Sequence, residues 1–446
     1  MGEAVAIYRK LFGDESVQLA ATMNGLASVI DKQGRHEEAE TLLREALAMQ
    51  RKLLGSKHKD IANTLTGLAT ILSSQGKRAD AEPFLREALA IKRKSLNNDD
   101  PSLAGAIANL AILLAAQQQN AEAETLFREA LETGRKLPDH AHPDEASWLS
   151  RLALVLEKQG ELTGAETTHR EAVAIARKSL GNEHLQVMIS LSRLALLLDS
   201  RGRLTEAEPM HREALEIARE SAKYYPPAVE APLYELAQNL YRQNKFADAE
   251  PLYREVIESR KTHLKPEHDD VLVPTGVRAS LLADWALTER GALSEVRNLS
   301  RAERDSLPEA AQRGSAEAES NPEITARARE AEHVLRECLA IRLRGPNANH
   351  WRTSGVRTRL GGALLAVAVT DPALNTETRE AKFKEAEPLL LEGNEALQQS
   401  KEVGSIYQRD ALVRLVRFFE AWEKPDKAAE WQTKLDEFDK PGAGPK

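Results

Sequence analysis

A repeat of 42 residues is the feature of this sequence that most restricts its fold. An Ala-Glu pair recurs at this spacing six times, and a Leu-Ala pair precedes it by 13 residues each time. The alanines of the Ala-Glu pairs are Ala39, Ala81, Ala123, Ala165, Ala207 and Ala249, and the leucines of the Leu-Ala pairs are Leu26, Leu68, Leu110, Leu152, Leu194 and Leu236. Because a period of this length is typical of stacked repeats, we expect an elongated array instead of three globular domains along 446 residues.

Each repeat contains two helices joined by a short turn, which we call helix A and helix B. A polar break such as Gln33-Gly34 separates the two pairs, and Gly or Asn at this place takes the left-handed conformation that ends a helix. The following segment, for example residues 37–53, has apolar side chains at i, i+3, i+4 and i+7, which is the spacing of one helical stripe. Residues that cap free N–H groups mark the expected starts of helices A at Asp60, Ser102 and Asp144.

Helix B carries a Glu and an Arg one turn apart in all six repeats. A Glu followed by an Arg at i+4 stabilises an isolated helix by about 0.3 to 0.5 kcal/mol. We interpret the pairs as support for the helix and not as catalytic carboxylates. The pairs are Glu40/Arg44, Glu82/Arg86, Glu124/Arg128, Glu166/Arg170, Glu208/Arg212 and Glu250/Arg254.

The composition agrees with helices and narrows the classes of function. Aromatic residues make up only 4% and hydrophobic residues 42% of the chain, which suits close-packed helices better than β-sheets. A net charge of −8 argues against nucleic acid or an anionic membrane as a partner. The longest apolar stretch, near residues 110–116, is too short to cross a bilayer, and the N-terminal residues form no secretion signal. With Cys338 as the only cysteine, these features predict a cytoplasmic protein without disulfides.

The repeat resembles the tetratricopeptide repeat, in which a Leu-Ala pair in helix A and an Ala at the start of helix B define the unit. Its length and an Arg-Glu-Ala-Leu box resemble the kinesin light chain subtype of that family. The box stands at residues 44–47, 86–89, 128–131 and 212–215. The resemblance covers residues 15–266 and implies an all-α, right-handed superhelical solenoid of helix-turn-helix repeats with about nineteen helices in the whole chain.

The regular array is followed by a divergent part. Residues 1–266 contain a half repeat and six pairs, whereas residues 267–439 contain three divergent pairs with insertions near 291–322 and 370–382. We expect the first insertion to be a loop or a short helix, and residues 440–446 to be a disordered tail. Four aromatic residues of the last pair are expected to close the end of the core: Phe418, Phe419, Trp422 and Trp431.

The divergent part also suggests an alternative role. It resembles the terminal region of tetratricopeptide proteins from planctomycete-like and verrucomicrobial bacteria, some of which carry similar repeats after a Ser/Thr kinase domain. The chain is then expected to be the regulatory or sensor portion of a larger signalling protein such as a bacterial Ser/Thr kinase. A catalytic domain encoded in frame upstream of Met1 would distinguish this alternative.

The sequence contains no motif of a known catalytic or nucleotide-binding site. Phosphate-binding loops, dinucleotide fingerprints, kinase signatures, Gly-x-Ser-x-Gly and His-Glu-x-x-His do not occur. We therefore predict a protein that is not an enzyme and that needs no cofactor and no metal.

The histidines are explained by the period. One linker position carries a histidine in four places, where other repeats have Asp100 and Pro226, and we interpret it as a linker preference. The four are His58, His142, His184 and His268. His169 and His211 occupy a helix B position where other repeats have large packing residues. A zinc ion shared by these two is the alternative, although no third ligand recurs there.

The remaining candidate site is a groove. In tetratricopeptide repeats the helix A residues just before the Leu-Ala pair face the concave surface, where members of the family bind peptides. The predicted groove residues are Asn24, Thr66, Asn109, Ser150, Arg151, Ser192, Arg193 and Arg359. Arg151 and Arg193 favour an acidic peptide or a terminal carboxylate, since a guanidinium binds carboxylates in bidentate fashion. The alternative is that these two arginines pair with carboxylates of the chain such as Glu157 and Asp199.

The predicted function is therefore that of a non-enzymatic scaffold. Its concave groove is expected to bind a peptide or a helix of another protein, with neither nucleic acid nor membrane as a partner.

Overall fold

The computed structural model consists of α-helices. It describes residues 13, 15–95, 100–136, 144–223, 225–298, 321–345, 348–400 and 403–440, which form eighteen α-helices, one short 3-10 helix and no strand. The expected half repeat at residues 1–12 and nearly all of the expected tail, residues 441–446, lie outside these ranges. The chain divides into two compact units, residues 1–217 and 218–446, which are described separately below.

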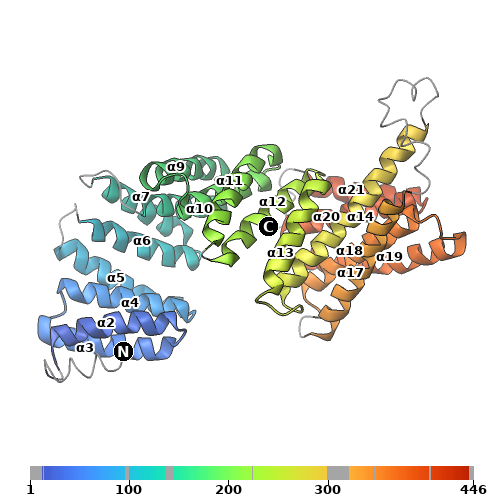
Figure 1. Cartoon of the computed structure of the whole chain (residues 1–446). Helices are drawn as coiled ribbons and strands as arrows, with labels where there is room; N and C mark the ends of the chain where they lie inside the picture. Colours follow the sequence, from blue (N-terminus) through green and yellow to red (C-terminus); the bar gives the residue numbers. More distant parts are fainter. Residues whose placement is uncertain are drawn as a thin grey trace. The chain divides into compact units, whose positions relative to one another are not determined.

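Unit 1 is a stack of helix pairs. Helix A packs against helix B of the same repeat, and each helix B packs against the next helix A (Figure 1). The helices are α2 (Val17–Lys32), α3 (His36–Leu54), α4 (Lys59–Ser74), α5 (Arg78–Ser95), α6 (Pro101–Ala116), α7 (Asn120–Arg135), α8 (Glu145–Gln159), α9 (Leu162–Leu180), α10 (Leu185–Ser200) and most of α11 (Leu204–Ala222).

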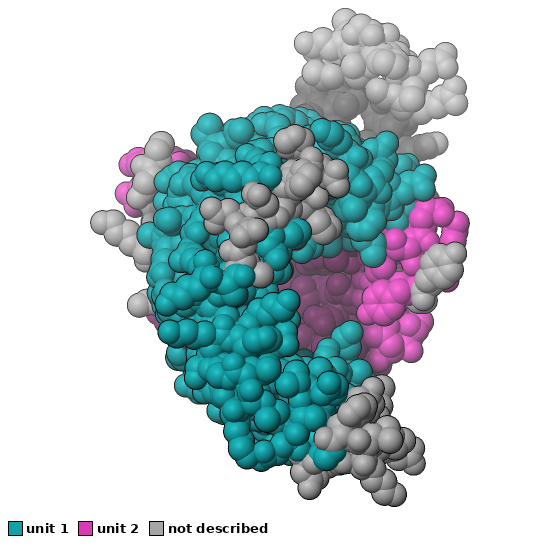
Figure 2. Space-filling view, turned by 90° about the vertical axis from the view of Figure 1, so that its left-hand side faces the viewer, with its two compact units in different colours: residues 1–217 teal, residues 218–446 magenta. Residues whose placement is uncertain are grey.

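Successive helices A of unit 1 lie closer together than successive helices B. Within the described residues α2 contacts α4, α6 contacts α8 and α8 contacts α10, whereas no contact of similar extent joins α3 to α5, α5 to α7 or α7 to α9. A stack whose members are closer on one side curves toward that side. The helices A therefore form the inner side of unit 1, and in Figure 2 the teal residues of this unit curve around a hollow.

The alanines that mark the 42-residue period explain how the two helices of a repeat approach each other. All six alanines of the Ala-Glu pairs are fully buried, at 0% exposure. A methyl group at the contact lets two helix backbones come to the short end of the usual distance between packed helices, about 8 to 10 Å. A larger side chain at this position would separate helix A from helix B.

The linker histidines cap the helices that follow them, which supports the interpretation of that position as a linker preference. The His58 ring accepts a hydrogen bond from the backbone N–H of Asp60, and His184 and His268 do the same with the residues two positions later. Asp100 caps α6 in the same way through its carboxylate. His142 lies outside the described residues.

The expected capping residues of helices A need a correction. Asp60 and Ser102 lie inside the first turn, because the capping side chain stands two residues before each of them. Asp144 is at the N-cap of α8 but makes no capping hydrogen bond with its side chain. The 42-residue spacing identified the right segment, but the capping position lies two residues earlier, where the His58 ring and the Asp100 carboxylate accept the hydrogen bond.

Unit 2 also consists of helix pairs, two of which are modified. Its elements, beyond the end of α11, are η1 (Pro226–Val229), α12 (Glu230–Arg242), α13 (Phe246–Lys261), α14 (Asp269–Asn298), α17 (Pro322–Arg344), α18 (Trp351–Thr370), α19 (Thr376–Gln399), α20 (Ser405–Ala421) and α21 (Pro425–Phe438). Helix α14 packs against α17, which is the pairing expected for a repeat split by an insertion. Residues 291–298 continue α14, and residues 299–320 lie outside the described ranges.

The extra residues near 370–382 lengthen helices and do not form a long loop. Helix α18 has 20 residues and α19 has 24, with only residues 371–375 between them. Two glycines allow these long helices to touch closely. A Cβ atom on Gly361 would lie 2.5 Å from Leu390 Cγ, and one on Gly393 would lie 2.6 Å from Thr358 Cγ2.

Of the four aromatic residues expected to close the end of the core, two are buried in the last repeats, whereas Trp422 and Trp431 are half-buried. Phe418 and Phe419 on α20 are almost fully buried. The ring of Trp422 stacks on Phe383 of α19, with 5.4 Å between the ring centroids. Within the described part of the chain, no helix has the length and apolar character needed to cross a membrane.

Candidate functional site

The outward face of the helices A in unit 1 changes along the stack. Each of these helices presents three half-buried or exposed positions, spaced by one turn, on the same side. The first position is occupied in turn by Ala21, Asn63, Gly105, Ser147 and Ile189, the second by Gly25, Gly67, Asn109, Arg151 and Arg193, and the third by Ser28, Thr70, Ile112, Leu154 and Leu196. Small side chains thus dominate α2, α4 and α6, whereas α8 and α10 present arginine and large aliphatic side chains.

The predicted groove residues of unit 1 fall into two rows. The first row consists of the residues that stand two positions before the leucine of the Leu-Ala pair. Two of its members contact the neighbouring helix A. The Asn24 side-chain amide donates to Thr64 Oγ1 at 2.6 Å, and the hydroxyl oxygens of Ser150 and Ser190 are 3.3 Å apart. Ser150 is buried and also donates to the carbonyl of Ala146. Asn24 and Ser150 therefore join consecutive repeats.

The other two members of this row have partly accessible side chains. Thr66 and Ser192 are half-buried, and the Thr66 hydroxyl donates to the carbonyl of Ala62 in its own helix.

The row one position before the Leu-Ala pair faces outward. Asn109 and Arg151 are exposed and Arg193 is half-buried. The side chain of Arg151 makes no hydrogen bond and no ion pair with any residue that the structure describes. The expected alternative partner Glu157 instead lies against His169, with 2.8 Å between Oε1 and the ring Nε2. The guanidinium of Arg151 is thus available at the inner face of unit 1.

His169 and His211 are packing residues that bind carboxylates within their own repeats. Both side chains are fully buried, and His211 Nε2 lies 2.9 Å from Asp199 Oδ2. Each histidine of helix B therefore binds a carboxylate of helix A in its own repeat. Among the described residues, no group of three His, Cys, Asp or Glu side chains could hold a metal ion.

Arg359 lies in unit 2, on α18. It is half-buried, and its side chain, like that of Arg151, forms no hydrogen bond or ion pair with the described residues. Two tyrosines of the sixth repeat are close enough to interact with its charge. Burial raises the pKa of Tyr234 to about 12 and raises that of Tyr253 well above its ordinary value, while the positive charge of Arg359 acts against both shifts. The rings of Tyr234 and Tyr253 are in edge contact, with centroids 5.8 Å apart.

The tyrosines beside Arg359 were not singled out as candidate site residues from the sequence. Tyr253 is fully buried, and its hydroxyl has no hydrogen-bond partner within the described ranges. Such a hydroxyl costs about 1 to 3 kcal/mol unless water or a ligand satisfies it. The sequence gave little indication of this role for Tyr253, because a tyrosine at this helix B position is also expected for a residue that packs in the core.

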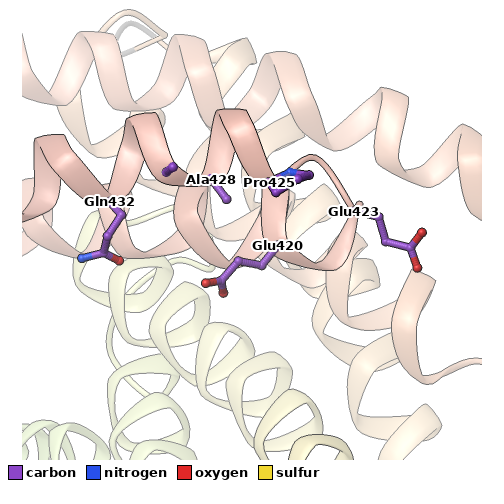
Figure 3. A pocket seen from close by; sticks show the side chains of 6 residues that line it. Glu420, Glu423, Pro425, Ala428 and Gln432 are labelled. Carbon is purple, nitrogen blue, oxygen red and sulfur yellow. The ribbon is translucent and has the colours of Figure 1, made fainter.

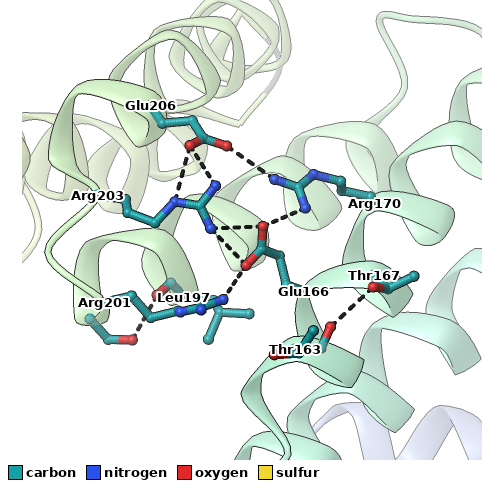
Figure 4. A network of polar contacts seen from close by, with 9 residues as sticks. Thr163, Glu166, Thr167, Arg170, Leu197, Arg201, Arg203 and Glu206 are labelled. Atoms are coloured by element: carbon teal, nitrogen blue, oxygen red, sulfur yellow. Dashed lines mark hydrogen bonds and ion pairs between the residues drawn. The ribbon is translucent and has the colours of Figure 1, made fainter.

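The polar network around Glu166 is structural. This carboxylate binds Arg170 of its own helix and accepts hydrogen bonds from Arg201 and Arg203 of the following repeat (Figure 4). Burial acts to raise the pKa of Glu166, but the hydrogen bonds from Arg203 and Arg170 outweigh it and the pKa is lowered. The i, i+4 Glu-Arg pairs predicted from the sequence are thus present, and this one also connects two repeats.

A depression of about 690 Å³ lies on the last helix pair. Its lining side chains come from the end of α20, the turn and α21 (Figure 3). Glu420 and Gln432 project to one side of this pair, and Glu423 points away from them. The six lining residues, Glu420, Glu423, Pro425, Ala428, Ala429 and Gln432, include no pair of groups placed for acid-base or nucleophilic chemistry.

Comparison with known proteins agrees with this architecture. One family model described as tetratricopeptide repeat matches residues 1–52, 18–94, 103–163 and 144–220, and a second model with the same description matches residues 233–270. Together they cover more than half of the chain. The chain is a tetratricopeptide repeat protein. Repeats of this family form scaffolds for interactions between proteins, and neither family model is that of an enzyme.

Solved structures similar to this chain include the following three. A putative kinesin light chain from Podosopora anserina with nearly identical TPR-like repeats is 26% identical over 47% of this chain and 99% of its own, with a TM-score of 0.41. BtubC (BKLC) from P. vanneervenii is 20% identical over 52% of this chain and 94% of its own, with a TM-score of 0.46. A Rap protein complexed with Competence and Sporulation Factor is 13% identical over 95% of this chain and 98% of its own, with a TM-score of 0.42. No curated protein matches the sequence.

Proposed function

We propose that this tetratricopeptide repeat protein is a cytoplasmic, non-enzymatic scaffold that binds an acidic peptide segment of another protein on the helix A face of unit 1. The observation that carries the proposal is Arg151, an exposed arginine without a partner among the described residues, on the inner face of the stack. An exposed guanidinium next to apolar side chains suits a peptide that combines carboxylates with aliphatic residues.

The surroundings of Arg151 support a peptide of this kind. Leu154 follows on the same face of α8, and Ile189 and Leu196 on α10 are 38% and 45% exposed. Large aliphatic side chains exposed together on one face favour a binding surface over a solvated one. The small side chains on α2, α4 and α6 leave space for the backbone of an extended peptide.

The predicted groove residues take different roles in this proposal. Asn109, Arg151 and Arg193 would contact the peptide, while the buried Ser150 would position the helices; Asn24, Thr66 and Ser192 would contribute both to packing and to the inner surface. Arg359 would donate hydrogen bonds to a separate carboxylate, in unit 2.

A selection of peptides from a random display library on the purified full chain tests the proposal. We expect enriched peptides with Asp or Glu next to aliphatic residues, and weaker binding to the Arg151→Glu/Arg193→Glu variant by at least tenfold. The control is Lys94→Glu/Lys178→Glu, which makes the same charge change at exposed positions of helices B. If both double variants lose peptide binding equally, the loss results from the change in net charge. If neither variant loses binding, this face is excluded as the binding site.

A further inference from the structure

Four side chains of unit 2 that donate hydrogen bonds form a cluster contributed by four helices. They are Tyr234 of α12, Tyr253 of α13, Arg359 of α18 and Tyr407 of α20. The rings of Tyr234 and Tyr253 are in edge contact, and the ring of Tyr407 lies 5.7 Å from that of Trp351 on α18, between centroids. Burial is the main cause of the raised pKa values of Tyr234 and Tyr253, and Tyr407 and Arg359 are close enough to add smaller effects of opposite sign. We call these four residues the tyrosine–arginine cluster.

The donors of the tyrosine–arginine cluster have no acceptor in the part of the chain that the structure describes. The side chains of Tyr253, Arg359 and Tyr407 form no hydrogen bond there. The hydroxyl of Tyr234 only accepts one, from the side-chain amide of Gln238 at 2.6 Å. The hydroxyl of Tyr241 in the same repeat, by contrast, donates to Asp284. Since buried polar groups nearly always have a partner, the cluster lacks an acceptor that a ligand can supply.

The position of Tyr253 in its repeat shows that packing does not require its hydroxyl. The third repeat has Phe127 at the same place of helix B, and this side chain is also fully buried. In the fourth and fifth repeats the position holds His169 and His211, each of which binds a carboxylate of helix A. The helix A residue that corresponds to these carboxylates in the sixth repeat is Tyr241. The hydroxyl of Tyr253 is therefore buried at a cost in stability that no described residue offsets.

The charge of Arg359 indicates which kind of ligand fits the cluster. Two further arginines near the cluster are paired: Arg260 lies 3.3 Å from Glu230, and Arg342 lies 2.9 Å from Asp269. One unpaired positive charge beside three neutral hydroxyls matches a group with one negative charge. A carboxylate has this charge, and its two oxygens bind a guanidinium side by side while their remaining lone pairs accept from hydroxyls.

The cluster is accessible from the solvent. Tyr234, Arg359 and Tyr407 are half-buried, so a ligand can reach them, and the fully buried Tyr253 forms the inner end. Arg359 lies over Gly355, one turn earlier on α18, where a Cβ atom would be 3.7 Å from Nη1. Because no hydrogen bond or ion pair with a described residue holds the Arg359 side chain, it can turn toward a ligand and open the way to the Tyr253 hydroxyl.

We propose that the tyrosine–arginine cluster binds one carboxylate group of a peptide. Arg359 would bind both carboxylate oxygens, and the hydroxyls of Tyr234, Tyr253 and Tyr407 would donate to their remaining lone pairs. This inference extends the contact with a carboxylate proposed above for Arg359, and it does not depend on the helix A face of unit 1. The C-terminus of a peptide and an Asp or Glu side chain share this chemistry, and the test distinguishes them.

Fluorine NMR of the full chain labelled with 3-fluorotyrosine tests this proposal. The chain has seven tyrosines, and variants that replace each of them by Phe assign the resonances. The ligands are acetyl-Ala-Leu with a free C-terminal carboxylate, acetyl-Glu-Leu amide with a side-chain carboxylate, and uncharged acetyl-Ala-Leu amide. We expect at least one of the two carboxylates to shift Tyr234, Tyr253 and Tyr407 in a saturable way, and no ligand to shift the exposed Tyr225. The carboxylate that saturates the shifts at the lower concentration identifies the source.

Two variants separate binding by the cluster from effects on the fold. Arg359→Gln is expected to weaken carboxylate binding at least tenfold. The matched change Arg357→Gln, on the opposite side of α18, is expected to leave it unchanged. Tyr253→Phe is expected to weaken binding at least threefold, measured at Tyr234 and Tyr407, while the melting temperature stays the same or rises. A hydroxyl with a purely structural role would instead leave binding unchanged and lower the melting temperature of this variant.

Three results would overturn the proposal. The first is the absence of saturable shifts with both carboxylates, and the second is equal affinity of the wild-type chain and Arg359→Gln. The third is a set of shifts of the same size with the uncharged amide, because these require no carboxylate. The Arg151→Glu/Arg193→Glu variant leaves all four residues of the cluster unchanged. Carboxylate binding measured in this variant therefore distinguishes a failure of the present proposal from a failure of the one for unit 1.

Discussion

Nη2 of Arg51 donates hydrogen bonds to both carboxylate oxygens of Glu87, at 2.8 and 2.7 Å, across 36 residues of sequence. The pair joins helix B of the first repeat to helix B of the second. The same pairing recurs at 42-residue intervals in Arg93–Glu129, Arg135–Glu171, Arg177–Glu213 and Arg219–Glu255. Exposed helices that share few direct contacts are thereby connected by a regular series of ion pairs.

We predict that each pair of this series contributes little to stability by itself. Both partners are largely exposed, so Arg93→Ala or Glu129→Ala is expected to lower the free energy of unfolding by less than about 1 kcal/mol. Exchanging the charges in Arg93→Glu/Glu129→Arg is expected to recover most of this loss. Urea unfolding of the two single variants and the exchanged double variant measures the coupling. A loss above about 2 kcal/mol for either single variant would contradict the prediction.

The close approach of α18 and α19 predicts opposite effects for two Gly-to-Ala changes. Gly393→Ala places a methyl group against Thr358 Cγ2 and the backbone of α18, so we expect destabilisation of about 1 to 3 kcal/mol. Gly25→Ala on α2 meets no atom within 4 Å and is expected to stabilise by up to about 1 kcal/mol, since alanine is the better helix former. Thermal unfolding followed by circular dichroism compares them. Two changes of the same sign would refute the packing argument.

The packing role of His169 predicts which substitutions it tolerates. Other repeats have Leu43, Leu85, Phe127 and Tyr253 at this position. His169→Leu is therefore expected to change the free energy of unfolding by about 1 kcal/mol or less, because Glu157 is partly exposed and can turn to water. His169→Ala leaves a cavity and is expected to cost about 2 to 4 kcal/mol. Equal effects of the two variants in urea unfolding would argue against a packing role.

Acid is expected to weaken the contact between the fourth and fifth repeats. Burial acts to raise the pKa of Glu166, but the hydrogen bonds and positive charges of Arg203 and Arg170 together outweigh it, so the pKa is lowered from its ordinary value of 4.5. A carboxylate with a lower pKa in the folded chain stabilises the fold fully above its unfolded pKa, and this contribution is lost as the pH falls through the folded value. We expect the melting temperature to fall below about pH 4.5, and less steeply in Glu166→Gln. Parallel curves for the two proteins would assign the acid sensitivity to other carboxylates.

The sequence predicted the local features well because they depend on neighbours within one or two turns. The helix pairs and the Glu166–Arg170 type of ion pair follow from periodicities of three to four residues. The candidate site was less predictable. Ser150 and Arg151 are adjacent in the sequence and were both assigned to the groove, yet Ser150 is buried against the next helix A and Arg151 is exposed. Which of two adjacent residues the next repeat covers depends on the rotation between repeats, which no local pattern specifies.

The sequence by itself determined that this chain is a stack of helix pairs, because a 42-residue period with one apolar stripe per helix has no other way to bury its hydrophobic residues. The tertiary structure decided which polar residues are satisfied inside the stack and which remain available. Glu157 was near Arg151 in the sequence but binds His169, and Glu166 of the fourth repeat binds Arg203 of the fifth. Contacts between repeats depend on the distances and angles between helices, and those follow from packing along the whole stack.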